Sequence, residues 1–287
     1  MGQMEKLFLS IGAMKAGTTW LYSLLERHPQ IHFTPEKEIH FLAHNYLDKK
    51  YLTEDHRRHR AQTRLHNIGN LRPERQELIR SWYNDQYLNG TPSLAWYQNL
   101  FSRGQGGPGW NADFSNLSAL IQAEGWKSLR SEVSGTIKAI YILREPCERL
   151  WSQYKFSGHS HENINPSDFE QQIAHFLSDP DVNVHSQYCS NLDAVREGLG
   201  HQNVKAILFD DIQDQPKALL ASVEQFLEIT ARDHSSHNNL HRRINTTAAQ
   251  ALPAVFRKHC APIIERELDG LLARGIEVPR RWRETPA

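Results

Sequence analysis

The sequence has few cysteines, no long apolar run and no excess of charge of either sign. Its three cysteines, Cys147, Cys189 and Cys260, form no C-x-x-C pair. A disulfide scaffold and a thiolate zinc site are therefore disfavoured, and we expect a reducing, cytoplasmic setting. No stretch approaches the ~20 apolar residues that a membrane-spanning helix needs. The short polar segment 1–6 does not resemble a secretory signal.

The charges balance, with 33 Lys and Arg residues against 33 Asp and Glu residues in a chain of 287. Proteins that coat polyanions normally carry a clear basic excess, so we expect neither a nucleic acid nor a membrane as partner. Sixteen histidines are the one unusual count. Because they lack the carboxylate or thiolate co-ligands of a rigid metal site, we expect no bound metal.

Short apolar segments alternate with segments of helical periodicity. Strands are predicted at 7–11, 31–34, 137–143 and 204–209, and helices at 18–27, 146–155, 186–197, 216–227 and 252–273. Two further helices are predicted around 78–83 and 93–101, within a polar stretch. This alternation predicts an α/β fold with a central, mostly parallel β-sheet flanked by helices, and the length fits a single domain over 1–287.

The turn between the first strand and the first helix has the composition of an anion-binding loop. It reads Gly12-Ala13-Met14-Lys15-Ala16-Gly17-Thr18-Thr19. Glycines allow a tight turn, and the free N–H groups at a helix start attract an anion. Lys15 adds a positive charge, and the two threonines add hydroxyls. A nucleotide-triphosphatase loop places its lysine directly after the second glycine, whereas here the lysine lies in mid-loop.

This loop, continued by Trp20 and Leu21, resembles the 5′-phosphosulfate loop P-K-[SA]-G-T-T-x-L. That loop belongs to sulfotransferases that use 3′-phosphoadenosine 5′-phosphosulfate (PAPS), and Met14 replaces the usual proline. The resemblance spans roughly residues 7–272 and implies a P-loop-like sulfotransferase fold, PAPS as donor, PAP as product and no metal requirement. The donor-binding residues that it implies in this loop are Lys15, Ala16, Gly17, Thr18, Thr19 and Trp20.

A second segment, from Arg144 to Tyr154, begins where a predicted strand ends. Open α/β sheets bind ligands at strand carboxyl ends, and an arginine there can grip a phosphate, although alone it could equally form a surface ion pair. The segment resembles the family's 3′-phosphate element, R-[DN]-P-x-[ED]-R-x-x-S-x-[YW], with Glu145 in place of Asp or Asn. By this resemblance Arg144 and Ser152 hold the 3′-phosphate. Arg242 and Arg243 resemble the basic segment that closes over the nucleotide.

The segment 35–42, followed by 96–101, is similar to the K-E-x-H-F-F…W-Y…F pattern of the heparan-sulfate-type and related bacterial sulfotransferases. In that branch the glutamate at Glu38 is the general base, which takes the acceptor proton. An extended segment would turn Glu38 and His40 to the same side. His40 could then orient Glu38, contact the acceptor or act as the base itself. Lys15 is the candidate for stabilising the departing PAP.

Weaker matches predict the acceptor side. Segments 110–115 and 186–188 loosely resemble family segments of this kind, and 44–110 is predicted as an inserted helical and loop region that shapes the acceptor pocket. The predicted acceptor contacts are Glu38, His40, Phe41, Asp113, Ser115 and Tyr188. The expected partner is a small-molecule or glycan acceptor, such as a natural product. O- or N-sulfation and a homodimer stay open.

Two other classes remain as alternatives. A P-loop-type nucleotide kinase would explain Asp210-Asp211 after a strand as a magnesium-binding pair, but the displaced Lys15 and the Arg144 element oppose it. A non-catalytic nucleotide-binding paralogue would typically lack Lys15 or the base, and this chain has both.

Overall fold

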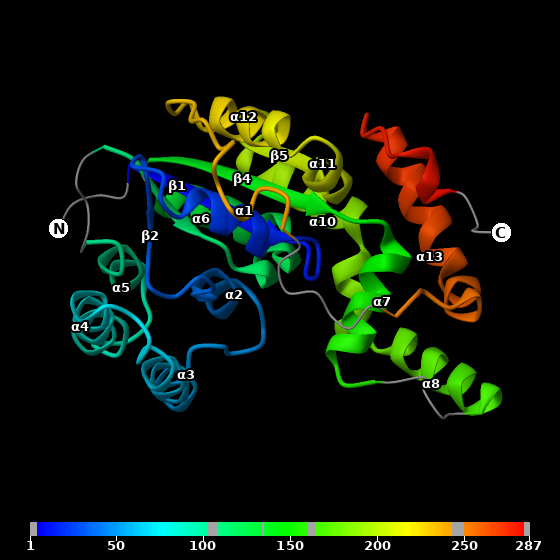
Figure 1. Cartoon of the computed structure of the whole chain (residues 1–287), viewed down its shortest axis with the longest axis horizontal. Coiled ribbons are helices and arrows are strands. Elements are labelled where there is room, and N and C mark those ends of the chain that lie inside the picture. Colours follow the sequence, from blue (N-terminus) through cyan, green and yellow to red (C-terminus); the bar gives the residue numbers. More distant parts are fainter. Residues whose placement is uncertain (1–4, 103–107, 134, 160–164, 243–249, 284–287) are drawn as a thin grey trace.

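The computed structural model describes residues 5–102, 108–133, 135–159, 165–242 and 250–283 (Figure 1). Its strands are β1 (Lys6–Gly12), β2 (Ile31–Phe33), β3 (Trp110–Asp113), β4 (Thr136–Leu143) and β5 (Val204–Leu208). They form one parallel sheet in the order β2-β3-β1-β4-β5. In β1 and β4 every residue after the first is buried, because helices cover both faces of the sheet. The predicted single α/β domain with a parallel sheet is confirmed.

Helices pack on both faces because the connections between strands run in two directions along the sheet. α1 (Thr18–Leu25) leads from β1 towards β2, whereas α6 (Ala123–Glu132) and α10 (Tyr188–Leu199) lead the other way, to β4 and β5. Right-handed crossovers therefore put α1 on one face, with α12 (Pro216–Leu227) beside it, and α6 with α10 on the other (Figure 1). α6 and α10 touch closely, since a Cβ on Gly198 would lie 2.1 Å from the Cβ of Trp126.

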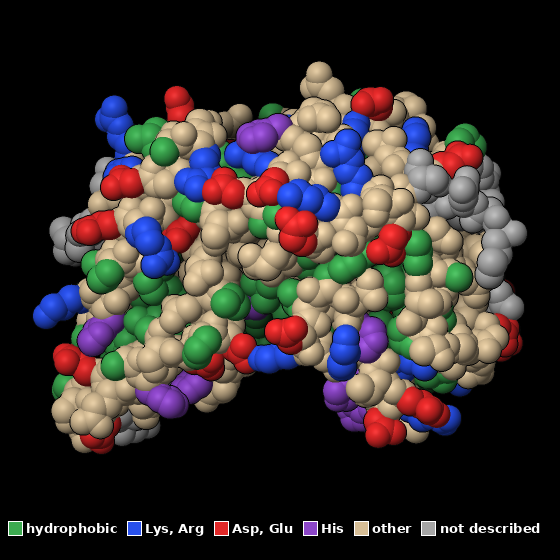
Figure 2. Space-filling model, turned by 180° about the vertical axis from the view of Figure 1, so that it is seen from behind, with side chains coloured by type: hydrophobic (Ala, Val, Ile, Leu, Met, Phe, Trp, Pro, Cys, Tyr) green, Lys and Arg blue, Asp and Glu red, His purple; other side chains and the backbone are tan. Residues whose placement is uncertain are grey.

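Two groups of helices extend beyond the sheet. One holds α2 (Phe41–Tyr46), α3 (Glu54–His66), α4 (Pro73–Trp82), a π-helical turn (Tyr83–Tyr87) and α5 (Leu94–Asn99). The other holds α7 (Pro146–Phe156), α8 (Pro166–Ser178), the short α9 (Pro180–Asn183) and α13 (Ala254–Ala273), which continues through Pro262. They form two lobes in Figure 1, and the space-filling view from behind shows the molecule hollowed between them (Figure 2).

The expected strands and most expected helices match the structure to within about two residues, but β3, α3, α6 and α8 were not predicted. α3 carries almost no apolar residue, and only Arg57 and Ala61 of its side chains are buried. Hydrophobic periodicity is therefore absent from α3, although Thr53 caps its first turn by accepting the N–H of His56. In the part of the chain that the structure describes, no helix is long and apolar enough to cross a bilayer.

Candidate active site

The predicted site residues meet at one edge of the sheet. The anion loop follows β1, the Glu38 segment follows β2, Asp113 ends β3 and Arg144 follows β4. Since all these strands are parallel, their carboxyl ends share an edge. The connections between strands lead to opposite sides of β1, which makes this place a topological switch point. Open α/β sheets bind ligands at such a point.

The anion loop turns sharply around its own backbone. Gly12, Lys15 and Gly17 have φ angles of 139°, 65° and 90°. A Cβ on Gly17 would also lie 2.8 Å from Ile212, so only glycine fits there. Ala16 is fully buried under the loop, and it supports the turn without offering a side chain to a ligand. The resulting concave backbone and the start of α1 form an anion seat.

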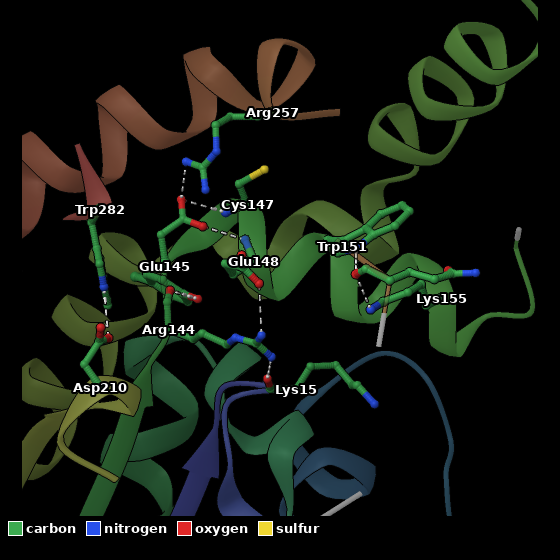
Figure 3. A network of polar contacts seen from close by, with 12 residues as sticks. Lys15, Arg144, Glu145, Cys147, Glu148, Trp151, Lys155, Asp210, Arg257 and Trp282 are labelled. Carbon is green, nitrogen blue, oxygen red and sulfur yellow. Dashed lines mark hydrogen bonds and ion pairs between the residues drawn. The ribbon is translucent and has the colours of Figure 1, made fainter. Parts of the chain in front are cut away.

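Three cations converge beside this loop. Burial, and then the charges of Arg144 and Lys155, lower the pKa of Lys15. Arg144 donates from Nη1 to the Lys15 carbonyl at 3.1 Å and from Nη2 to Glu148 at 3.2 Å, so the two predicted nucleotide motifs touch directly (Figure 3). Such mutual repulsion between cations costs free energy unless an anion is bound among them.

The contacts of Glu145 explain why this chain can carry a glutamate where the family's 3′-phosphate element has Asp or Asn. Its carboxylate caps α7 by accepting the N–H groups of Cys147 at 3.2 Å and Glu148 at 2.6 Å (Figure 3). Arg257 of α13 lies 3.5 Å from the same carboxylate. The start of α7 is thus fixed, and with it the direction in which Arg144 leaves β4. Ser152 lies further along α7 and is 8% exposed.

Glu38 is surrounded by cationic side chains that the sequence analysis had not assigned. Lys37 donates from Nζ to Glu38 Oε1 at 3.1 Å and to the hydroxyls of Thr18 and Thr19 at 3.2 and 3.3 Å. Arg60 of α3 donates to the Glu38 carbonyl at 2.5 Å. Lys37 therefore joins the anion loop to the candidate base. The motif around Glu38 contained Lys37, but only the fold places it against the two threonines.

His40 meets Glu38 by a different backbone path from the one expected. The segment is not extended at His40, whose φ of 61° is left-handed. Its Nε2 lies 3.4 Å from Glu38 Oε2. Burial lowers the pKa of His40 to about 4, and its buried Nδ1 has no hydrogen-bond partner among the described residues. Burial therefore keeps the ring neutral, with Nε2 beside the Glu38 carboxylate and Nδ1 enclosed in the interior.

Four of the predicted acceptor contacts lie in the interior. Phe41, Asp113 and Ser115 are each 1% exposed, and Tyr188 is fully buried. Phe41 stacks on Tyr97 with ring centroids 4.6 Å apart. Tyr188 donates its hydroxyl to the Arg144 carbonyl at 2.8 Å. In this structure these side chains contact other protein groups, and the direct contact with an acceptor that the sequence predicts for them stays a prediction.

Trp20 and the basic C-terminal segment are also placed differently from the expectation. The Trp20 ring is 4% exposed, and its Nε1 donates to the carbonyls of Asn239 at 3.1 Å and Leu240 at 3.2 Å. Trp20 therefore ties α1 to the turn before Arg242, whose side chain is exposed. The predicted contact of Arg243 lies outside the described residues.

The acidic pair after β5 is not arranged as a kinase would need. Asp210 accepts a hydrogen bond from Arg281 Nε at 2.6 Å. It accepts a second one from Trp282 Nε1 at 2.9 Å (Figure 3). This carboxylate therefore binds the helical turn Arg280–Trp282, near the end of the described residues. Among the described residues, no cluster of three or more His, Cys, Asp or Glu side chains could hold a metal ion.

A parallel α/β sheet whose anion loop, arginine and carboxylate share one edge has the arrangement expected of a site that binds an anionic ligand beside a proton acceptor. The chain belongs to the sulfotransferase domain family, which it matches over residues 6–260. The class of reaction is therefore sulfuryl transfer. Among curated proteins, none matches the sequence significantly.

Solved structures show the same fold at low sequence identity. A sulfotransferase from Alicyclobacillus acidocaldarius superposes with a TM-score of 0.65 at 16% identity, covering 98% of this chain and 99% of that one. The sulfotransferase domain of the Synechococcus olefin synthase gives 0.52 at 16%, covering 97% and 98%. Sulfotransferase STF9 from Mycobacterium avium gives 0.52 at 13%, covering 96% and 79%. At such identities the likeness concerns the fold.

Proposed function

We propose that the protein transfers the sulfuryl group of PAPS to a hydroxyl or nitrogen of a small-molecule or glycan acceptor, as in the glutamate-base branch of the family. The observation that carries the proposal is the meeting of Lys15, Arg144 and Lys155 at the anion loop. PAPS has anionic groups at both its 5′ and 3′ positions. The cations of the loop after β1, the end of β4 and α7 fit such a doubly anionic nucleotide. Lys37, together with the two threonine hydroxyls, fits the 5′-phosphosulfate.

In the proposed reaction the acceptor oxygen or nitrogen attacks sulfur while its proton passes to Glu38. The bond between sulfur and the bridging phosphate oxygen breaks. PAP leaves with one more negative charge on its 5′-phosphate than that phosphate carried in PAPS. Lys15 is the group that stabilises this charge, and Lys37 supports the charge spread over the sulfuryl oxygens. The products are the sulfated acceptor, PAP and the proton released from Glu38.

Glu38 is favoured over His40 as the base. A base must reach the acceptor with a free lone pair, but the Nε2 of His40 lies 3.4 Å from the Glu38 carboxylate and its Nδ1 is buried. The Glu38 side chain is 28% exposed, whereas that of His40 is 11% exposed. His40 is therefore the group that orients Glu38.

The function is tested by PAP release from purified protein with PAPS and probe acceptors of different classes. The probes are 4-nitrophenol, a primary alkanol, glucosamine and a chito-oligosaccharide, with water as acceptor in their absence. We expect PAPS-dependent sulfation of at least one probe, unchanged by EDTA. Phosphoryl transfer from ATP that EDTA abolishes would contradict the proposal and restore the kinase alternative.

We expect Arg144→Ala to weaken donor binding more than it slows turnover. The loss should be about 10- to 100-fold in the Kd of PAP, because a hydrogen bond to a charged group contributes roughly 1.5–3 kcal/mol. Calorimetric titration with PAP measures it. Arg144→Lys keeps the charge but not the two-armed contact with Lys15 and Glu148, so it should recover only part of the loss. A Kd equal to wild type in Arg144→Ala would remove Arg144 from the nucleotide site.

A further inference from the structure

A buried carboxylate lies directly behind the candidate base. Asp113, at the end of β3, is 1% exposed and accepts hydrogen bonds from three groups. Ser115 Oγ donates to its Oδ1 at 2.5 Å, the Tyr97 hydroxyl donates to its Oδ2 at 3.0 Å, and the backbone N–H of Ile39 is the third donor. Burying a carboxylate costs free energy unless its oxygens accept hydrogen bonds. The donors around Asp113 therefore match a carboxylate at this position.

These bonds continue into the turn formed by residues 37–40. Ser115 Oγ, while donating to Asp113, accepts the backbone N–H of His40 at 2.8 Å. The N–H of Phe114 donates to the Lys37 carbonyl at 3.2 Å. Arg60 holds the Glu38 carbonyl from the opposite side. Each of the four residues in the turn therefore has a backbone group bound by a neighbouring element.

The turn needs such support because its backbone is unfavourable on its own. A residue with a side chain rarely adopts the left-handed φ of 61° found at His40, and such positions cost roughly 1–3 kcal/mol. They persist only where surrounding contacts fix them. In this turn the backbone conformation is also what brings His40 Nε2 to 3.4 Å from the Glu38 carboxylate. Loss of the support would let Glu38 and His40 separate.

We propose that Asp113, acting through Ser115 and with Tyr97, is a positioning residue that fixes the turn 37–40 and so holds Glu38 in the orientation for proton transfer. The inference rests on the proposed role of Glu38 as base. Asp113 itself neither contacts the acceptor nor exchanges a proton in the reaction. A displacement of about 1 Å at a reacting group can cost roughly 100-fold in rate, so small changes in this network matter.

The test is Ser115→Ala, which removes the hydroxyl that links Asp113 to the His40 N–H. Turnover is measured with the fastest probe acceptor, or as PAPS hydrolysis with water as acceptor where no probe reacts. We expect kcat to fall about 10- to 100-fold. The KM for PAPS and the Kd for PAP should stay within about twofold, because ground-state donor binding is untouched. Ser10→Ala is the matched control, since it removes a buried hydroxyl that has no hydrogen-bond partner among the described residues.

A double-mutant cycle with Glu38→Gln separates positioning from a general structural effect. If Ser115 acts through Glu38, its removal should change kcat less than about twofold once Glu38 is glutamine. Tyr97→Phe provides a second variant, because it deletes one donor to Asp113 and keeps the ring stacked on Phe41. Its effect on kcat should likewise fall below about twofold once Glu38 is glutamine.

Each outcome decides between distinct conclusions. Wild-type kcat in both Ser115→Ala and Tyr97→Phe would overturn the positioning role. An equal loss with and without the Glu38 carboxylate would overturn it too, because that pattern indicates a general loss of structure. Wild-type kcat in Glu38→Gln alone would instead remove the base from the proposed function, and the inference with it.

Discussion

Glu38→Gln is expected to lower kcat by about 10²–10⁴-fold, the range that a positioned general base contributes. Glutamine keeps the size and an oxygen acceptor for Lys37 but cannot take a proton. The donor site does not depend on this carboxylate, so the Kd for PAP should remain within about twofold of wild type. Single-turnover transfer from radiolabelled PAPS measures the loss, and calorimetry measures PAP binding.

Glu36→Gln is the matched control for this variant. Glu36 lies two residues earlier and accepts the Tyr83 hydroxyl at 2.5 Å, a bond that the glutamine oxygen can also accept. We expect its kcat to stay near wild type. His40→Gln should cost less than Glu38→Gln because His40 orients the base. Full activity of Glu38→Gln together with inactivity of His40→Gln would reverse the two roles.

The pH dependence of turnover gives a second distinction between these two residues. Burial lowers the pKa of His40 to about 4, from its ordinary value of 6.5. The ring is therefore neutral throughout pH 5.5–8 and gains its proton only as the pH falls towards 4. If His40 were the base, it would produce an acidic limb of the kcat profile near pH 4, and that limb would disappear in His40→Gln. We expect the acidic side of the kcat profile to keep its shape in His40→Gln, because His40 orients the base and is not the base itself.

The sequence predicted best what depends on neighbouring residues in the chain. The anion loop and the Arg144 element are short segments at strand ends, so anion binding can be predicted from the residue types within each segment. Lys37, Arg60 and the surroundings of Asp113 depend on contacts between β2, β3 and α3, which no local pattern records. The residues at 41, 113, 115 and 188 were therefore predicted near the site, but their contacts with other protein groups were not predicted.

The backbone at His40 shows the same limit in another form. An extended segment was the natural expectation after a strand, and alternation would have paired Glu38 with His40. The structure pairs them by a left-handed turn, which Ser115 and Asp113 hold from a distant strand. Unfavourable local conformations of this kind are set by tertiary contacts, so propensity alone does not predict them.

Although the net charge of the chain is zero, positive side chains cluster at the anion loop, and Lys15 lies among them. Lys15→Met is expected to lower kcat by about 10²–10³-fold, similar to the removal of one donor that stabilises developing charge. The reason is that the lysine is proposed to meet the negative charge that forms on the bridging oxygen as PAP leaves. Methionine fills a similar volume, so the loop conformation should persist. Steady-state kinetics with varied PAPS separate the effects on kcat and KM.

Lys155→Met tests whether any cation of the cluster would serve as well. Lys155 contributes to the positive charge around Lys15 but belongs to the last turn of α7 and not to the anion loop. Its loss should weaken PAP binding and change kcat less than about threefold, since it adds general attraction for the nucleotide. If Lys15→Met raised only the KM for PAPS and left kcat intact, Lys15 would bind the ground state alone. The stabilisation of the leaving group would then be assigned to Lys37, whose ammonium group donates to the threonine hydroxyls of the anion loop.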